Sequence, residues 1–583
     1  MKQQNKTLKV AALSSLALLI NQSAMISNAQ AAEAMSKASV SEITKPVVAC
    51  GDLKNVDLTA IGGAGSQVTS AKETLIGEQM MCVVEGNLAP TIGFKVKLPV
   101  NNWHARYLQI GCGGLCGSMP EEIGAASGCD ALENGEFTSA TTDMGHQGNV
   151  DFGRDPQKRA DFAYRSLHLT SETAKTMIKA YYGKTQAFSY FTGCSDGGRE
   201  ALIEAQRYPT DFDGIIAGAP AMNFEVQNGI YHPYLTQSNT GKDGKPIVLA
   251  NRVALIHKAV LDQCDALDGQ KDGLIADPLS CHFNPKVLQC KAGATDTSSC
   301  LTAEETEAVR RFYAGPTDPK TGKRMIAGGP LPGSELAWAG VFVPQHHDDM
   351  IFSQIISQGA RNVLFKDIPD DSKFSFTTMK FDHALFNQLK EMHSFYDSTN
   401  PDLTKFYKHG GKLILWHGWA DQHISPVNTI EYHKAVQKFM GEKVAKQFER
   451  LYLIPGMNHC QGGEGPNLID LLSPMMAWVE HGHAPEAVIA KKAKVEVNSA
   501  FGQPTNDKSA TDKKEPPKPV MQKASQMIIE ESRPVYPYPY MAAYKGKGDP
   551  TVAESYHPVK LKSADLKVDW LGNDLYKPYQ LIH

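Results

Sequence analysis

A short glycine-containing stretch around Ser195 has the residue types and spacing of a catalytic turn. Residues 193–197, Gly-Cys-Ser-Asp-Gly, satisfy the pattern G-x-S-x-G. A β-prone run at 188–192 precedes it and a helix-prone run at 198–205 follows, which is the context in which the pattern marks a nucleophile elbow. Glycine fits two positions either side of the serine because so tight a turn leaves little room for side chains. The alternative is an ordinary glycine-rich turn with an incidental serine.

A serine hydroxyl needs partners before it can act as a nucleophile. A base must take its proton, and a carboxylate must orient that base. Asp421 and His459 follow Ser195 in the chain order Ser, Asp, His that an α/β-hydrolase topology requires. Taken alone, Asp421 is also compatible with a helix cap and His459 with a surface histidine. Because all three lie just past expected strands, the sequence predicts a catalytic triad of Ser195, Asp421 and His459.

The elements that must position these residues are buried strands that end where the polar residues begin. The apolar patterns predict helices at 166–182, 250–261 and 303–313, and strands at 94–98, 106–110, 213–220, 412–416 and 450–454. Loops after such strands are where α/β folds carry functional residues. We therefore expect an α/β fold with an α/β-hydrolase core and a large inserted lid domain.

The length of the chain indicates more than one ordinary domain, since domains usually hold roughly 100 to 250 residues. Strand spacing is lost in the middle of the chain. We expect the core to occupy 45–220 and 401–583 and the lid domain, with a calcium loop, to occupy 221–400. The polar, lysine-rich stretch 498–526 is expected to be a surface loop.

A glycine-rich loop follows the strand expected at 106–110. It reads Gly111-Cys112-Gly113-Gly114. In α/β-hydrolases the loop after an early strand supplies an N–H that points at the substrate carbonyl oxygen. We expect the N–H groups of Asp196 and of Gly113 or Gly114 to hold the oxyanion. A plain flexible loop is the alternative.

The first 31 residues have the pattern of a signal peptide. Lysines at the start precede an apolar run at 10–20 and the sequence Ala-Gln-Ala at 29–31, so the protein is expected to be secreted or periplasmic. No later run approaches the roughly 18 apolar residues of a membrane span. The net charge of −4 falls to about −7 without the three leader lysines. That charge argues against nucleic acid or an anionic membrane as partner.

Eleven cysteines all follow the leader, and their odd number leaves at least one without a partner in the chain. In an oxidising compartment they indicate a disulfide set, with Cys50 and Cys82 a plausible pair. Cys194 precedes the proposed nucleophile and Cys460 follows the proposed base. If serine and histidine are within hydrogen-bond reach, these neighbours come within the roughly 4.4 to 6.8 Å Cα separation of a disulfide. Pairing elsewhere is the alternative.

These motifs together resemble the tannase/feruloyl esterase family. The stretches GCSDGGRE, HGWAD and GMNHC carry the resemblance, which covers essentially the whole chain after the leader. It implies an α/β-hydrolase core with a lid inserted between nucleophile and acid. It also implies Ser195 as nucleophile, His459 as general base, Asp421 as its orienter, and a disulfide between Cys194 and Cys460.

A second signature lies in the expected lid, at 264–274, CDALDGQKDGL. Three carboxylates at short spacing with two glycines could surround a hard cation with oxygen ligands. The spacing is not that of an EF-hand, so a solvated acidic turn is the alternative on the residues alone. The resemblance implies a structural Ca²⁺ site whose ligands are the side chains of Asp265, Asp268 and Asp272 and the carbonyls of Gln270 and Leu274.

The resemblance also implies two disulfides in the lid, Cys264 with Cys281 and Cys290 with Cys300. Cys112, Cys116 and Cys129 are then left over, and we expect Cys116 to pair with Cys129. Cys112 stands inside the presumed oxyanion loop, which is unusual for the family. Its presence leaves open which N–H of that loop donates.

The resemblance implies a serine esterase that acts on a small aromatic ester. Hydroxycinnamate esters, feruloyl or caffeoyl as in chlorogenate, are the first expectation; gallate esters follow, and terephthalate monoesters are within the family's range. Lid aromatics could wall the acyl group, although each alone is more often a core residue; they include Phe342, Phe352, Phe374, Phe381 and Phe386. A secreted serine peptidase and a non-catalytic binder on the same fold are alternatives from other classes.

Overall fold

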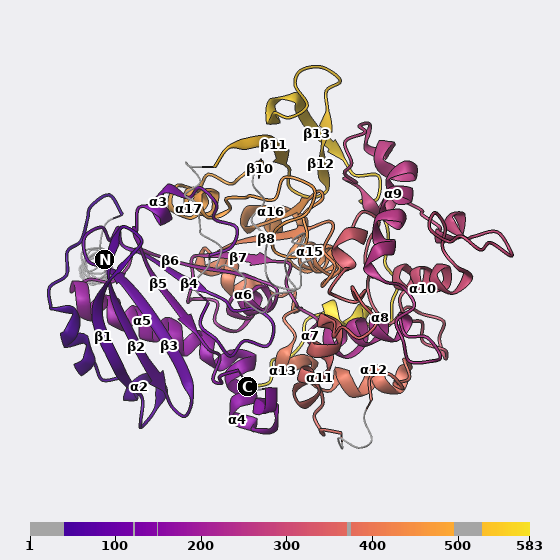
Figure 1. Cartoon of the computed structure of the whole chain (residues 1–583). Coiled ribbons are helices and arrows are strands. Elements are labelled where there is room, and N and C mark those ends of the chain that lie inside the picture. Colours follow the sequence, from indigo (N-terminus) through magenta and orange to yellow (C-terminus); the bar gives the residue numbers. More distant parts are fainter. Residues whose placement is uncertain (1–39, 121–122, 149, 370–374, 495–526) are drawn as a thin grey trace, which may run out of the picture.

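The structure is a computed structural model of the chain (Figure 1), and it describes residues 40–120, 123–148, 150–369, 375–494 and 527–583. Three expectations lie outside these residues: the signal peptide at 1–31, Phe374, and the surface loop at 498–526. Among the described helices, none is both long and apolar enough to cross a membrane.

A nine-stranded sheet forms the centre of the molecule, in the order β1-β2-β3-β5-β4-β6-β7-β8-β9. The first four strands in this order pair antiparallel, and the pairs from β5 to β9 are parallel. The strands are β1 (Gln67–Ile76), β2 (Gln79–Leu88), β3 (Ile92–Pro99), β4 (Arg106–Ile110), β5 (Phe137–Thr142), β6 (Phe188–Cys194), β7 (Gly214–Gly218), β8 (Lys412–Gly418) and β9 (Glu449–Ile454). With helices on both faces, this is the expected α/β-hydrolase architecture.

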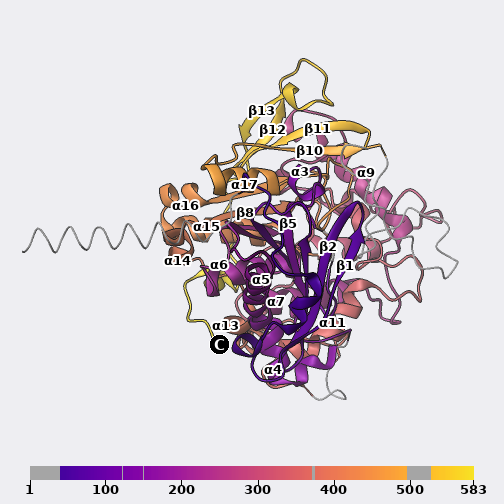
Figure 2. The same ribbon diagram turned by 90° about the vertical axis from the view of Figure 1, so that its left-hand side faces the viewer.

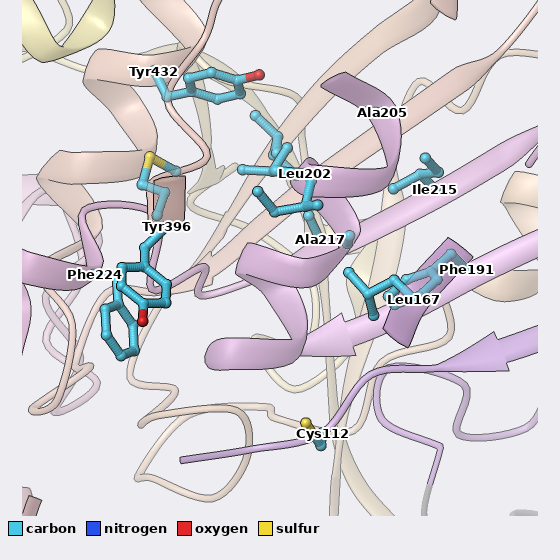
Figure 3. Packing of buried hydrophobic residues seen from close by; sticks show 14 of the residues in the cluster. Cys112, Leu167, Phe191, Leu202, Ala205, Ile215, Ala217, Phe224, Tyr396 and Tyr432 are labelled. Carbon is cyan, nitrogen blue, oxygen red and sulfur yellow. The ribbon is translucent and has the colours of Figure 1, made fainter. Parts of the chain in front are cut away.

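Helices cover the two faces of the parallel strands and bury them. One apolar cluster joins α6 to one face of β7, and a second joins α17 to the other face. Figure 3 shows Leu202 of α6 beside Ala217 and Ile215 of β7. Burying such a side chain contributes about 1.5–3 kcal/mol. The helices that pack on the sheet are α5 (Ser166–Tyr182), α6 (Asp196–Arg207), α15 (Pro426–Met440) and α17 (Leu472–His481).

The lid is the long excursion that leaves the sheet after β7 and returns at β8. It lies beside the sheet, to the right in Figure 1. Its helices are α7 (Phe224–Val226), α8 (His232–Ser238), α9 (Val253–Cys264), α10 (Ala303–Ala314), α11 (Phe352–Leu364), α12 (His383–Lys390), α13 (His393–Tyr396) and α14 (Thr404–His409).

Two small sheets at the end of the chain join the core to the lid. They lie together at one end of the molecule in both views (Figures 1 and 2). Arg533 in one of them pairs with Asp272 of the lid at 2.5 Å. The strands pair as β10 (Val488–Ala493) with β11 (Ile529–Val535) and β12 (Tyr540–Tyr544) with β13 (Tyr556–Lys560), and the remaining helices are α2 (Thr59–Gly62), α3 (Asp130–Glu133), α4 (Pro156–Ala160) and α16 (Glu442–Phe448).

Candidate active site

Ser195 stands on a strained turn between β6 and α6. Its φ of 66° and ψ of −121° are rarely adopted by residues other than glycine. A Cβ on Gly193 would lie 2.3 Å from the carbonyl oxygen of Gly197, and a Cβ on Gly197 would lie 2.8 Å from that of Cys112. Both glycines are therefore required by close backbone contacts. The turn holds the half-buried serine at the carboxyl end of the sheet.

Asp421 and His459 form a buried pair beyond the ends of β8 and β9. His459 Nδ1 lies 2.7 Å from Asp421 Oδ2, and the two residues are 3 % and 0 % exposed. The His459 backbone N–H donates to the side chain of Gln422 at 3.2 Å, which fixes the loop that carries the imidazole. This is the orientation that a general base and its carboxylate need.

The Asp421 carboxylate has further donors that the sequence did not reveal. Its Oδ1 accepts the N–H groups of His423 and Ile424, each at 2.8 Å, and its Oδ2 lies 3.0 Å from His417 Nε2. Burial disfavours the charged form, but the charge of His459 and the bonds from both histidines outweigh it and hold the pKa of Asp421 well below its usual range. Asp421 is thus ionised at neutral pH. His417 lies in the HGWAD motif, so the motif was visible but this contact was not.

One cleft contains Ser195 and His459. Its floor is the elbow and its walls come from the lid and from the loop after β8. His423 lies between the rings of Phe352 and His459, at centroid distances of 4.5 and 4.8 Å. The residues that line the cleft are Gly114, Ser195, Asp196, Ala221, Phe224, Gln227, Asn228, His232, Phe352, Ile356, His423, Ile424 and His459.

The lid histidine in this cleft is uncharged. His232 Nε2 accepts from the Gln227 amide at 3.2 Å, so Nδ1 donates to Ser353 Oγ at 2.9 Å. Burial, helped by the charge of His459, lowers the pKa of His232 to about 3. His232 therefore contributes a neutral ring to the cleft at physiological pH.

Of the two expected oxyanion donors from the glycine loop, Gly114 reaches the cleft. Gly113 is not among the lining residues, and its carbonyl accepts the Cys116 N–H at 3.0 Å. Asp196 begins α6 in the cleft floor, and its carboxylate is clamped by Arg199 at 2.7 and 3.0 Å. Gly114 and Asp196 are therefore the two expected donor residues that line the cleft together with Ser195.

The structure contains five disulfides: Cys50–Cys82, Cys112–Cys116, Cys194–Cys460, Cys264–Cys281 and Cys290–Cys300. Four of them are expected pairs, and Cys194–Cys460 ties the loop of Ser195 to the loop of His459 with a Cα separation of 5.9 Å. The expectation that Cys116 pairs with Cys129 was wrong. A turn brings Cys112 to a Cα separation of 5.5 Å from Cys116, while Cys129 is a buried thiol in the apolar cluster beneath α17.

Most of the lid aromatics expected to wall the cleft serve other contacts. Phe352 lines the cleft, as does Phe224, which was not singled out. Phe342 packs on Trp338 and Phe312 in the lid core, Phe381 packs on Tyr234, and Phe386 packs on Trp570. The expectation was wrong for these three because each finds an aromatic partner inside the lid or at its junction with the C-terminal segment.

The acidic lid loop is held in a defined shape. The Asp265 carboxylate accepts the N–H groups of Asp272 and Gly273, and Asp268 accepts that of Gln270. Asp272 pairs with Arg533. The expected ligand residues are thus gathered on one loop, stapled by Cys264–Cys281. Among the described residues, a tighter group of metal-ligating side chains consists of Cys112, Cys116, Asp196 and Glu200, but both sulfurs there are committed to a disulfide.

Comparison with known proteins places this geometry in a family. The sequence profile described as tannase and feruloyl esterase matches residues 74–559. The chain is 30% identical over 537 residues to mono(2-hydroxyethyl) terephthalate hydrolase of Piscinibacter sakaiensis, covering 80% of this chain and 83% of that one. It is 31% identical over 442 residues to a probable feruloyl esterase B-2 of Aspergillus flavus, covering 70% and 78%.

A solved structure agrees with the sequence comparisons. Feruloyl esterase B from Aspergillus oryzae superposes with a TM-score of 0.70 at 26% identity, covering 88% of this chain and 99% of that one. The match extends over both the sheet and the lid, so the likeness is not limited to a common core. The chain is a carboxylic ester hydrolase and belongs to the tannase and feruloyl esterase family.

Proposed function

We propose that this enzyme is an exported serine esterase that hydrolyses esters of aromatic acids, hydroxycinnamate esters first among them. The observation that carries the proposal is the 2.7 Å contact of Asp421 with His459 in the same cleft as Ser195, under walls that include Phe224 and Phe352. Aromatic walls suit a planar acyl group because ring contacts add to simple apolar burial.

In the proposed reaction, Ser195 Oγ attacks the ester carbonyl carbon while His459 Nε2 takes its proton. The carbonyl oxygen gains the negative charge and is held by the N–H groups of Asp196 and Gly114. The carbon–oxygen bond to the alcohol breaks as His459 returns the proton to the leaving oxygen. Water then attacks the acyl-enzyme by the same route and releases the acid. Throughout, Asp421 orients the imidazole and stabilises its charged form.

The charge of the cleft favours some aromatic acids over others. Among the described residues that line it there is no lysine or arginine, and His232 is neutral. A carboxylate buried without a cationic partner is costly. Ferulate, caffeate and gallate esters carry neutral phenols, so they suit this lining better than a terephthalate monoester, whose free carboxylate would enter with the ring. A terephthalate monoester is the second candidate substrate, because the chain is similar to mono(2-hydroxyethyl) terephthalate hydrolase.

The acidic lid loop is proposed to bind a structural Ca²⁺. Carboxylate and main-chain carbonyl oxygens are the ligands this cation prefers. The side chains of Asp265, Asp268 and Asp272 and the carbonyls of Gln270 and Leu274 would hold it. In support of this site, all five residues belong to one disulfide-stapled loop. The ion would brace the lid against the C-terminal strand that carries Arg533.

Export is supported by the disulfides, which persist in oxidising compartments. Full-length protein made in a bacterial host should be recovered outside the cytoplasm, with an N-terminus that follows Ala31 by sequencing. Cytoplasmic protein that keeps its first residues would contradict export.

The test of substrate is hydrolysis of methyl ferulate, chlorogenate, methyl gallate and mono(2-hydroxyethyl) terephthalate by the wild-type enzyme and by Ser195→Ala. We expect turnover of the phenolic esters, fastest for the hydroxycinnamates, and none above background in the variant. Preference for the terephthalate ester would overturn the charge argument. Activity retained by Ser195→Ala would overturn the serine mechanism.

A further inference from the structure

The loop that presents Gly114 to the cleft is closed into a small ring. Cys112 and Cys116 are joined by a disulfide across four positions, and the Cys116 N–H donates to the carbonyl of Gly113 at 3.0 Å. Gly114 and Cys116 have φ of 64° and 60°, conformations that a free chain of this composition would hold only part of the time. The disulfide therefore restricts the segment that carries a proposed oxyanion donor.

The ring is also fastened to the helix behind the nucleophile. Glu200 of α6 is fully buried, and its Oε2 accepts the Cys112 N–H at 3.2 Å. Its other oxygen, Oε1, lies 2.7 Å from Cys112 Sγ and 3.3 Å from Cys116 Sγ. One carboxyl group thus contacts both ends of the ring. Glu200 stands one helical turn after Asp196, so the same turn of α6 carries the other proposed donor.

The protonation state of Glu200 suits this role. Burial, and then the negative charge of nearby Asp196, raise the pKa of Glu200 well above its ordinary value, although Arg199 opposes this. This shift favours the neutral acid form of Glu200. As a neutral group it can donate one hydrogen bond and accept another, and it brings no second negative charge beside the oxyanion.

We propose that Glu200 and the Cys112–Cys116 disulfide are positioning groups that set the separation between the Gly114 and Asp196 N–H groups. This inference rests on the proposed oxyanion role of those N–H groups. Donors aimed at the oxyanion matter more in the transition state than in the substrate complex. Loosening them should therefore lower kcat and leave KM nearly unchanged.

The variants are Glu200→Ala, Glu200→Gln and the double variant Cys112→Ser with Cys116→Ser. Full loss of an oxyanion donor lowers kcat by about 10² to 10³, so we expect a loss of roughly 10- to 100-fold for Glu200→Ala and for the double variant. Glu200→Gln should stay within about threefold of wild type, because an amide of the same shape keeps one donor and one acceptor. The matched control is Cys290→Ser with Cys300→Ser, which opens another short disulfide loop in the lid.

The assay uses p-nitrophenyl acetate, with active sites counted by titration with a serine-reactive phosphonate. The second readout is inhibition by an arylboronic acid, which forms a tetrahedral adduct on the serine, compared with inhibition by the free aromatic acid. We expect boronate affinity to fall in parallel with kcat while binding of the free acid is unchanged. Variants that lose thermal stability but keep kcat per titrated site would overturn the proposal, as would equal losses in Glu200→Gln and Glu200→Ala.

The choice of substrate separates this inference from the proposed function. A wild-type enzyme that hydrolyses p-nitrophenyl acetate but none of the aromatic esters refutes the proposed specificity, and the kcat and boronate comparisons still decide the role of Glu200. If Ser195→Ala retains activity on p-nitrophenyl acetate, both proposals fall together.

Discussion

Adding one methyl group at Gly197 should disturb the oxyanion loop without touching any catalytic side chain. A Cβ at this position would lie 2.8 Å from the carbonyl oxygen of Cys112 and 3.0 Å from the carbonyl carbon of Gly111. Both atoms are main-chain, so they cannot turn aside. Ordinary contact begins near 3.4 Å, which requires the loop to retreat by roughly 0.6 Å, and a misplacement of about 1 Å can cost 10²-fold in rate.

We therefore expect Gly197→Ala to lower kcat by about 10- to 100-fold, equivalent to about 1.4–2.7 kcal/mol, and stability by about 1–3 kcal/mol. Gly62→Ala is the matched control. Its Cβ would lie 2.3 Å from Ser66 Oγ and 2.8 Å from Leu88 Cβ, far along the chain at the antiparallel end of the sheet. It should lose stability alone. The measurements are urea unfolding and kcat per phosphonate-titrated site. Removing an oxyanion donor costs about 10²-fold or more in kcat. A kcat within twofold of wild type for Gly197→Ala would therefore refute the reasoning.

Three further predictions concern the parts that hold the lid and the loops. His257 lies 2.7 and 2.8 Å from two glutamates, which outweigh its burial and raise its pKa to about 10. The free energy that this charged histidine adds to folding is complete below its pKa in the unfolded chain, about 6.5, and is lost as the pH rises to about 10. The unfolding free energy of His257→Gln, measured in urea, should therefore match that of the wild type only at alkaline pH. Chelation with EDTA should lower the melting temperature of protein prepared with Ca²⁺, and Asp268→Asn should abolish this response. Replacing Cys194 and Cys460 by serine should cost about 2–5 kcal/mol of unfolding free energy and reduce kcat, measured by the same two assays; an unchanged kcat would show that the bridge serves stability alone.

The parallel part of the fold could be predicted because its strands are continuous apolar runs. β4 coincides with the expected strand at 106–110, and α5 coincides with the expected helix at 166–182. A strand buried on both faces needs apolar residues at nearly every position, so its bounds are visible in the sequence. The active-site residues follow the ends of such strands, and that is why Ser195, Asp421 and His459 could be proposed together.

Strands β1 and β5 could not be predicted, for the opposite reason. β1 is mostly exposed and mixes Lys, Glu, Ser and Thr with few apolar residues, so it shows no clear alternation. β5, with the sequence FTSATT, is buried but rich in Ser and Thr. Both are strands because neighbouring strands satisfy their backbone groups, and this information lies elsewhere in the chain.

The contacts of Cys112, Glu200 and His417 could not be predicted from the sequence either, because they form only in the tertiary structure. In the sequence, Glu200 looks like an ordinary polar residue on a surface helix. In the structure it is fully buried against the loop of Cys112, 88 positions away in the chain. His417 lies four residues before Asp421, a spacing that on a helix would suggest a paired face. Here the two meet because the chain turns sharply after β8 and folds its loop back over the strand end.

Chemistry and specificity are therefore encoded differently in this chain. The candidate catalytic residues follow strand ends that sequence periodicity reveals, whereas lid residues such as Phe352 and His232 line the cleft through contacts that follow from packing alone. A cleft whose described lining has no lysine or arginine selects against acyl groups that carry a carboxylate, because that charge would lose its water without gaining a cationic partner. Introducing a cation at Ile356, as Ile356→Arg, supplies the missing partner for a carboxylate, and it should shift preference from ferulate toward terephthalate monoesters if the lining governs acyl choice.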